Sequence, residues 1–234
     1  ICTGAATARD PGHAARGCRF LMGSGVQRVG VLGGTFDPVH AGHLHMARAA
    51  ERACQLSRIY FVPAAAPWHR GKPPTASYAD RFAMLALALN GRPHWMPLAV
   101  PDSTGRPTYT IDQLAWMRKH GYGEPLYFIL GADSFATLPS WRRWRELLGQ
   151  CHWIVLGRAA ARHLPDVVPA HMKAAATRDE LVLRSGTRIH WLAHFEQPAS
   201  ASAVRERLAG RGKAPVAAAV ARYAGRAGLY QIHG

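Results

Sequence analysis

The chain has 234 residues, a length that a single α/β domain with one sizeable core accommodates. Hydrophobic residues make up 48% of it and charged residues 18%, a balance that excludes a largely disordered or fibrous protein. Its 29 lysines and arginines outnumber its 14 aspartates and glutamates, and the resulting net charge of +15 favours an anionic partner.

Membrane and disulfide-rich classes are also excluded. Arg, His, Asp or Gly interrupts every apolar run before the roughly 18 residues that a membrane-spanning helix needs. The cysteines are scattered without metal-ligand spacing, which indicates neither a disulfide scaffold nor a zinc site; they are Cys2, Cys18, Cys54 and Cys151. The N-terminal segment lacks the apolar stretch of a signal peptide. We therefore expect a cytoplasmic protein with no membrane partner and no metal site built from its own side chains.

Residues 1–27 are rich in Ala, Gly and Arg and show neither helical nor strand periodicity. They predict a disordered N-terminal extension, and Met22 is an alternative start of translation. Residues 28–234 are expected to form a single domain.

Within that domain, short apolar runs alternate with segments of helical spacing. The predicted strands are 28–34, 58–63, 94–100, 126–131, 151–157 and 187–192. The predicted helices are 40–54, 78–90, 110–120, 141–148, 200–210 and 214–225. This alternation predicts an α/β fold, a Rossmann-like parallel sheet flanked by helices, with a C-terminal helical pair. Residues 159–186 are less regular, with a weakly helical part at 170–181, and residues 229–232 predict a closing extended piece.

The segment GGTFDPVHAGH, residues 33–43, follows the first predicted strand. Gly33 and Gly34 let the backbone approach a ligand, and the helix that follows offers free N–H groups and a positive dipole end. His40 and His43 are three residues apart, which places both imidazoles on one helical face. This pattern predicts a phosphate site at the carboxyl edge of the sheet, and it matches neither GxGxxG nor the P-loop. The alternative is a plain turn followed by surface histidines.

A second phosphate element is predicted near the C-terminus, in the segment SASAVR. Ser200 and Ser202 can cap a helix and also donate to an anion, and Arg205 adds an always-charged planar fork. The alternative is an ordinary capped helix.

GGTFDPVHAGH resembles the HxGH-type signature of the nucleotidyltransferase superfamily, in the form found in nicotinate mononucleotide adenylyltransferases. The resemblance runs from about Arg28 to the C-terminus, and further blocks follow in the family's order. They are APWHR (66–70), PTYTIDQL (107–114), FILGADSFATLPSW (128–141) and SASAVRERL (200–208).

The resemblance implies an enzyme of NAD biosynthesis with ATP and nicotinate mononucleotide as substrates and Mg²⁺ as cofactor. The mononucleotide phosphate attacks the α-phosphorus of ATP, and the products are the dinucleotide and pyrophosphate. The implied catalytic residues are His40, His43 and Arg205. Those implied for ATP and its phosphates are Gly33, Gly34, Thr35, Phe36, His69, Arg70, Asp133, Ser200 and Ser202. Those implied for the mononucleotide are Tyr109, Thr110, Trp141 and Arg158.

Several positions depart from the family's usual pattern. They are Trp68, Thr108, Ala159, Ala201 and Ser202.

Two alternative functions stay open. Pantetheine-phosphate adenylyltransferases share the phosphate signature but lack the PTYT and LPSW blocks. A nucleic-acid-binding module that kept this fold would explain the charge, but the cations form no single tract, which argues against nucleic-acid binding as the main role. Assembly into a homo-oligomer stays open as well.

Overall fold

The computed structural model describes most of the chain from residue 27 onward. The described ranges are 27–65, 73–101, 109–157, 166–177, 179–192, 195, 199–210 and 212–231. Some residues singled out above lie outside them: residues 1–26 of the predicted extension, Trp68, His69, Arg70, Thr108, Arg158 and Ala159.

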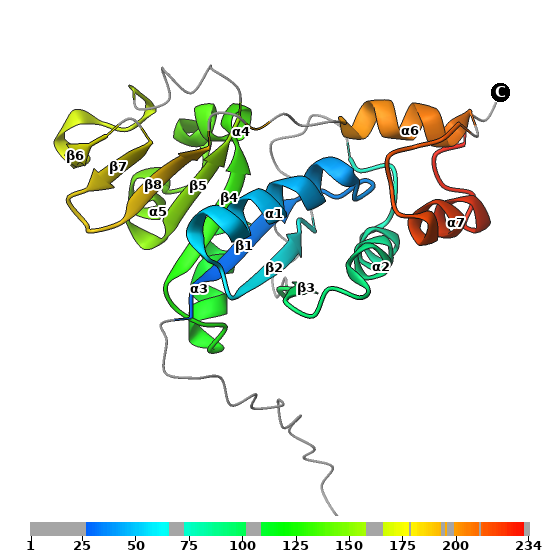
Figure 1. Ribbon diagram of the computed structural model, residues 1–234, viewed down its shortest axis with the longest axis horizontal. Coiled ribbons are helices and arrows are strands. Elements are labelled where there is room, and N and C mark those ends of the chain that lie inside the picture. The colour runs from blue at the N-terminus through cyan, green and yellow to red at the C-terminus, as the bar shows by residue number, and fades with distance from the viewer. Residues whose placement is uncertain are drawn as a thin grey trace, which may run out of the picture.

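Eight strands form one sheet through the middle of the molecule (Figure 1). They are β1 (Val29–Gly34), β2 (Arg58–Pro63), β3 (Trp95–Pro97), β4 (Leu126–Gly131), β5 (His152–Leu156), β6 (Lys173–Ala176), β7 (Glu180–Leu183) and β8 (Arg188–Leu192). Their order across the sheet is β3-β2-β1-β4-β5-β8-β7-β6. Neighbouring strands from β3 to β8 in that order pair parallel, and β7 and β6 add antiparallel. The predicted Rossmann-like parallel sheet is confirmed, with an antiparallel extension at one edge.

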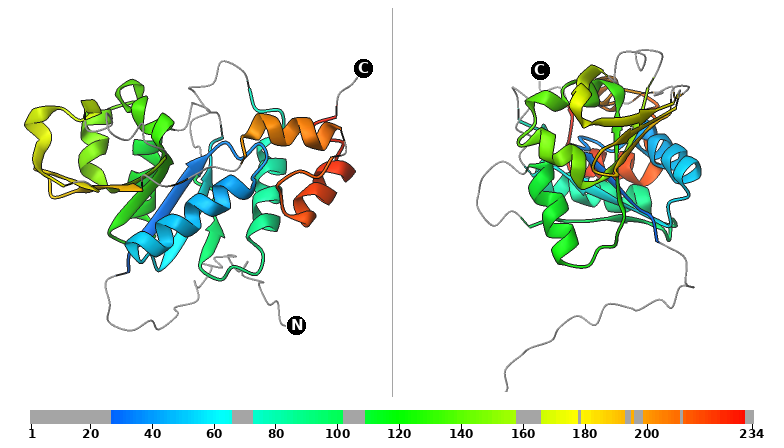
Figure 2. Two further views of the ribbon diagram at one scale, coloured as in Figure 1. Left: turned by 45° about the horizontal axis from the view of Figure 1, so that its top comes forward. Right: turned by 90° about the vertical axis from the view of Figure 1, so that its left-hand side faces the viewer.

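Helices cover both faces of this sheet, as Figure 2 shows. They are α1 (Ala41–Cys54), α2 (Tyr78–Leu89), α3 (Thr110–Lys119), α4 (Ala132–Ala136), α5 (Trp144–Gln150), α6 (Ala201–Ala209) and α7 (Ala218–Arg226), with 3₁₀ turns η1 (Leu138–Ser140) and η3 (Ala170–Met172). Successive residues of a strand point to opposite faces. Phe128 of β4 accordingly belongs to the core cluster that contains buried residues of α3 and α5, whereas Ile129 belongs to the cluster that contains those of α1, α2 and α7.

The predicted C-terminal helical pair is confirmed as α6 and α7, which lie at the α2 end of the molecule (Figure 1). The Tyr223 hydroxyl of α7 donates to Asp80 Oδ1 of α2 over 2.9 Å. The next segment bends back as a turn, and Tyr230 has a left-handed φ of 64°. The predicted extended piece at 229–232 is therefore wrong for Tyr230, because this turn carries its side chain into the interior, where it is 7% exposed.

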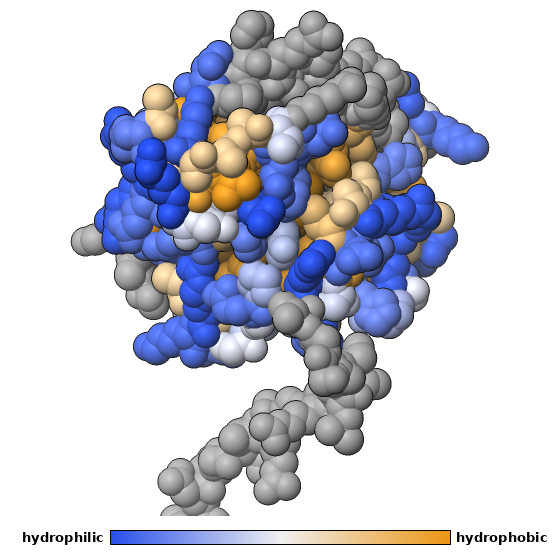
Figure 3. Space-filling view, turned by 60° about the vertical axis from the view of Figure 1, so that its left-hand side comes forward, coloured by the Kyte–Doolittle hydropathy of each residue, from blue (hydrophilic) through white to orange (hydrophobic). Residues whose placement is uncertain are grey.

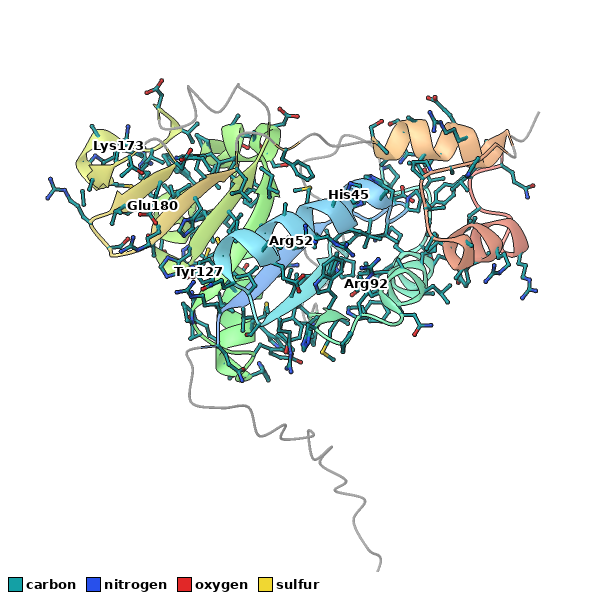
Figure 4. All side chains as sticks on the ribbon, viewed as in Figure 1. His45, Arg52, Arg92, Tyr127, Lys173 and Glu180 are labelled. Carbon is teal, nitrogen blue, oxygen red and sulfur yellow. The ribbon has the colours of Figure 1, made fainter. Side chains whose placement is uncertain are left out.

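The weakly helical prediction for residues 170–181 is wrong. After the short turn η3, this segment forms β6 and part of β7. Leu181 and Leu183 alternate with half-exposed neighbours and are each 1% exposed, so strand pairing with β8 buries both on one face. Lys173 and Glu180 mark this added edge in Figure 4.

Other differences concern element boundaries. The third strand covers only Trp95–Pro97, where proline lacks the N–H that would continue the ladder. The helix predicted from residue 141 begins at Trp144, because Arg143 takes a left-handed conformation. The short helix α4 was not predicted.

Hydrophilic side chains dominate the face drawn in Figure 3, where hydrophobic surface shows mainly in the recesses between them. Within the described ranges, no helix is both long and apolar enough to cross a membrane.

Candidate active site

A cavity of about 280 Å³ lies where the carboxyl ends of β1 and β4 meet. From this pair the sheet order departs in opposite directions, to β2 on one side and to β5 on the other. Such a switch point is the usual ligand crevice of an open α/β sheet. The predicted site residues that line the cavity are Gly33, Gly34, Thr35, Phe36, His43, Thr110, Asp133 and Trp141.

The cavity has two sides. We call residues 33–37 together with His43 the signature half. Thr110 and Gln113 of α3, with Trp141, form the opposite side, which we call the aromatic half.

Both glycines of the signature half lie against aromatic rings. A Cβ on Gly33 would stand 3.0 Å from Cζ of Phe128, and one on Gly34 would stand 3.1 Å from Cζ of Phe36. Phe36 itself has a φ of 51°, unusual for a residue with a side chain. The glycines thus let the loop close over two rings as well as exposing its backbone to the cavity.

Arg81 of α2 holds this loop from behind and is 1% exposed. Its Nη1 donates to the Thr35 carbonyl over 2.7 Å and to the Ala64 carbonyl over 2.8 Å. The other guanidinium nitrogens donate to the carbonyls of Ala65 (3.2 Å) and Ala76 (3.3 Å). Burial lowers the pKa of Arg81, but a guanidinium stays protonated in proteins. One side chain therefore ties together the segments that follow β1 and β2.

Asp37 anchors the far end of the same loop and is 4% exposed. Its carboxylate accepts hydrogen bonds from the backbone N–H groups of Thr75 (2.8 Å) and Ala76 (3.1 Å) and from the Tyr230 hydroxyl (2.8 Å). Burial, together with the hydrogen bond to Asp37 and its negative charge, raises the pKa of Tyr230 well above its ordinary value. The C-terminal turn is thereby fastened to the signature half.

The two histidine rings lie against each other at the start of α1, with ring centroids 3.9 Å apart and ring planes tilted by 36°. The helix was predicted from residue 40, but His40 is its N-cap, with an extended backbone, and Ala41 is its first residue. His40 Nδ1 accepts from the Gly42 N–H, and His43 Nδ1 accepts from the His40 N–H, both over 3.2 Å. His43 lines the cavity, whereas His40 lies behind it and is 2% exposed.

These hydrogen bonds assign the protons on both rings. Each Nδ1 is an acceptor, so the neutral form carries its proton on Nε2. Burial lowers the pKa of His40 to about 4, which keeps its imidazole neutral at pH 7. Each ring therefore presents an Nε2–H donor, and such a donor can stabilise a phosphoryl oxygen.

The second predicted phosphate element lies beside the first. Ser200 caps α6 by accepting from the Ala203 N–H over 3.3 Å. Arg205 donates from Nη1 to the Asp37 carbonyl over 2.8 Å and from Nη2 to Oγ of Ser202 over 3.3 Å. Residues 168 positions apart thus meet at the signature half, although none of Ser200, Ser202 and Arg205 lines the cavity itself.

The aromatic half starts from the first residue of α3, Thr110. Trp141 follows η1 and meets Phe128 edge to face, with ring centroids 6.1 Å apart. Tyr109 is the N-cap of α3 and does not line the cavity; the guanidinium of Arg142 lies 4.7 Å from its ring centroid. Of the residues predicted for the mononucleotide, Thr110 and Trp141 therefore face the cavity.

Four buried residues at or behind the cavity were not predicted from the sequence: Asp37, Arg81, Gln113 and Tyr230. A signal for Arg81 existed, because it falls in the buried stripe of α2 with Met84, Leu85 and Ala88. A signal for Gln113 existed too, since it follows Thr110 by three residues on one helix.

The fit of the cavity to a metal ion rests on two carboxylates. That of Asp37 is already occupied by three hydrogen bonds, whereas Asp133 is exposed and makes no hydrogen bond to another described residue. Among the described residues, no group of three His, Cys, Asp or Glu could hold a metal. One available carboxylate beside the loop predicted to bind phosphate fits Mg²⁺, which binds through one or two carboxylates together with substrate phosphates and water.

The chain is similar to known proteins over most of its length. A family model described as cytidylyltransferase-like matches residues 31–207. The probable nicotinate-nucleotide adenylyltransferase of Pseudomonas fluorescens is 39% identical over 214 residues, which cover 88% of this chain and 98% of the relative. The protein with the same description from Laribacter hongkongensis is 40% identical over 201 residues, covering 83% and 90%.

Solved structures share the fold. Plasmodium falciparum nicotinic acid mononucleotide adenylyltransferase complexed with NaAD superposes with a TM-score of 0.66 at 16% identity, covering 87% of this chain and 97% of that one. The same enzyme complexed with APC gives a TM-score of 0.65 at 16% identity over the same shares. Sequence and fold together place the chain: it belongs to the cytidylyltransferase-like family and, within it, to the nicotinate-nucleotide adenylyltransferases.

Proposed function

We propose that this protein transfers the adenylyl group of ATP to nicotinate mononucleotide, giving nicotinate adenine dinucleotide and pyrophosphate in NAD biosynthesis. The observation that carries the proposal is the pairing of a phosphate-binding loop with an aromatic half in one cavity. A reaction between two nucleotides needs both, because phosphates react while a flat ring is held nearby. Relatives at 39% and 40% identity are described as enzymes of this activity.

The reaction is an in-line displacement at the α-phosphorus of ATP. An oxygen of the mononucleotide 5′-phosphate forms the new bond to phosphorus, and the bond from phosphorus to the bridging oxygen of pyrophosphate breaks. No protein nucleophile takes part, so catalysis depends on positioning and on stabilising charge at the phosphoryl oxygens.

The signature half carries the donors for this chemistry in our proposal. His43 donates from Nε2 to a phosphoryl oxygen, and His40 fixes its neighbour's tautomer and ring position. Arg205 brings positive charge, with Ser200 and Ser202 at the same helix start. The backbone of the loop completes the phosphate site through Gly33, Gly34, Thr35 and Phe36.

The aromatic half and its surroundings hold the sugars and the pyridine ring. Trp141 offers an indole face to the cationic ring, and Thr110 lies close to the carboxylate. Tyr109 supports the start of α3, and Asp133 accepts hydrogen bonds from a ribose. The family resemblance adds His69 and Arg70 for the ATP phosphates and Arg158 for the mononucleotide.

Mg²⁺ would enter bound to ATP, with Asp133 as the available carboxylate of this chain. When bound, it neutralises charge on the departing pyrophosphate. Residues 28–234 act as one nucleotidyltransferase domain in this proposal, and the enzyme works in the cytoplasm.

Pyrophosphate release tests the proposal. The folded protein with ATP, Mg²⁺ and nicotinate mononucleotide should release pyrophosphate well above controls that lack one substrate. Phosphopantetheine in place of the mononucleotide should release none. Two results would overturn the assignment. One is pyrophosphate release no faster than in the enzyme-free control, and the other is release from ATP with phosphopantetheine but not with nicotinate mononucleotide.

A further inference from the structure

Gln113 is a buried polar side chain that lines the cavity, and its amide has no hydrogen-bonding partner among the residues that the structure describes. It is 7% exposed and lines the cavity from the second turn of α3. No hydrogen bond joins its amide group to any residue in the described ranges. The backbone N–H of Gln113, by contrast, is held in the helix by the Tyr109 carbonyl over 3.1 Å.

Buried amides are normally satisfied, so whatever fills this cavity must supply the partner for Gln113. The surroundings say which part of a ligand that is. Thr110 stands three residues earlier on the same helical face, and Phe128, Leu130 and Trp141 line the same side. A flat ring carrying one polar substituent fits such a surface, whereas a triphosphate does not.

We infer that Gln113 contacts the substituent of the pyridine ring, and that its amide N–H donates to the carboxylate of nicotinate mononucleotide. This inference rests on the proposed function and names the residue that meets the group by which nicotinate differs from nicotinamide. A carboxylate only accepts hydrogen bonds, and the amide nitrogen only donates them, so the two match. The carboxamide of nicotinamide can be met as well, if the Gln113 amide turns and accepts through its oxygen.

The substitution Gln113→Glu distinguishes donation to the nicotinate carboxylate from acceptance from the nicotinamide carboxamide, with almost no change in side-chain size. It replaces the donating NH₂ by a second acceptor oxygen that carries charge, so the nicotinate carboxylate meets repulsion. The NH₂ of nicotinamide still finds an acceptor. We expect kcat/KM to fall at least about tenfold for nicotinate mononucleotide and less than about threefold for nicotinamide mononucleotide. The KM for ATP should stay within about twofold, since the triphosphate lies at the signature half.

The matched control is Gln55→Glu, the same chemical change at the exposed C-cap of α1. Both mononucleotides should keep their specificity constants there. Equal losses for both substrates in Gln113→Glu, or no loss for either, would overturn the inference, because a structural defect does not distinguish a carboxylate from a carboxamide.

Gln113→Met covers the case in which the buried glutamate prevents folding, because it keeps the volume and removes the polar atoms. The KM for nicotinate mononucleotide should then rise at least about fivefold with kcat changed less, and an unchanged KM would overturn the inference. Calorimetric binding of the two mononucleotides to the unmodified protein and to Gln113→Glu gives a readout without turnover. An unmodified protein that binds both but transfers nothing defeats the proposed function, whereas unchanged relative affinities in Gln113→Glu defeat the role of Gln113.

Discussion

The two halves of the cavity differ in whether the protein itself supplies hydrogen-bonding partners for their polar groups. In the signature half the protein supplies them: Arg81 donates to the Thr35 carbonyl, and Asp37 accepts three hydrogen bonds. In the aromatic half and beside it, Gln113 and Asp133 make no side-chain hydrogen bond to another described residue. In the proposed reaction the reacting phosphates would therefore meet a fixed frame, and the second substrate would supply the hydrogen-bonding partners of the groups around it. A preorganised frame stabilises developing charge without reorganising during the reaction.

Removing the guanidinium behind the signature half should have the largest effect, a loss of stability. Arg81→Met leaves four backbone carbonyls without their donor, those of Thr35, Ala64, Ala65 and Ala76. We expect a loss of about 3–5 kcal/mol in the free energy of unfolding, measured by urea denaturation. The control Arg52→Met, on an exposed position of α1, should cost less than about 1 kcal/mol. Equal losses in both variants would show that Arg81 does not hold the loop.

Removing the donor that faces the cavity should be the next largest effect. His43→Ala should lower kcat at least about a hundredfold, the scale of losing one preorganised donor to a developing oxyanion. Stability should change little, and His45→Ala, an exposed histidine two residues along the same helix, should keep normal turnover. Near-normal kcat in His43→Ala would mean that the signature half does not act on the phosphates.

His40, the buried N-cap of α1, should make the stability of the protein depend on pH. The pKa of His40 is lowered to about 4, so between pH 6.5 and pH 4 the unfolded chain binds a proton that the folded protein does not. Stability should therefore fall with falling pH, by about 2 kcal/mol from pH 7 to pH 5 for this group. His40→Asn keeps an acceptor for the Gly42 N–H and should lose this share of the dependence in urea unfolding. The same pH dependence in both proteins would contradict the assignment.

The smallest effect is expected at Trp141 in the aromatic half, on the KM of the mononucleotides. Trp141→Ala should raise the KM of both mononucleotides alike by about fivefold, because stacking on the ring is worth about 1 kcal/mol and both substrates carry the same ring. Steady-state kinetics with each mononucleotide measures this. A rise confined to one of them would show that Trp141 contacts the substituent rather than the ring.

The location of the signature half could be predicted from the sequence because its residues are close together in the chain. Gly33, Gly34 and His43 follow one strand within a few residues, and a parallel sheet places such a turn at its carboxyl edge. The partners that hold this loop were missed, since Arg81 and Tyr230 come from distant segments and their hydrogen bonds depend on tertiary packing.

The antiparallel edge was missed for a related reason. Residues 170–181 contain many alanines and suggest a weak helix, but pairing with β8 overrides that local preference. Gln113 was overlooked, although it shares a helical face with Thr110, because a polar residue on an amphipathic helix normally predicts an exposed position.

Following the α-phosphorus of ATP tests whether the adenylyl group passes directly from ATP to nicotinate mononucleotide. ATP labelled at that phosphorus is incubated with Mg²⁺, nicotinate mononucleotide and the unmodified enzyme, and the products are separated. The account predicts that all transferred label enters the dinucleotide and that the pyrophosphate released in equal amount carries none. Label in the pyrophosphate, or label retained covalently on the protein, would contradict a direct adenylyl transfer in this cavity.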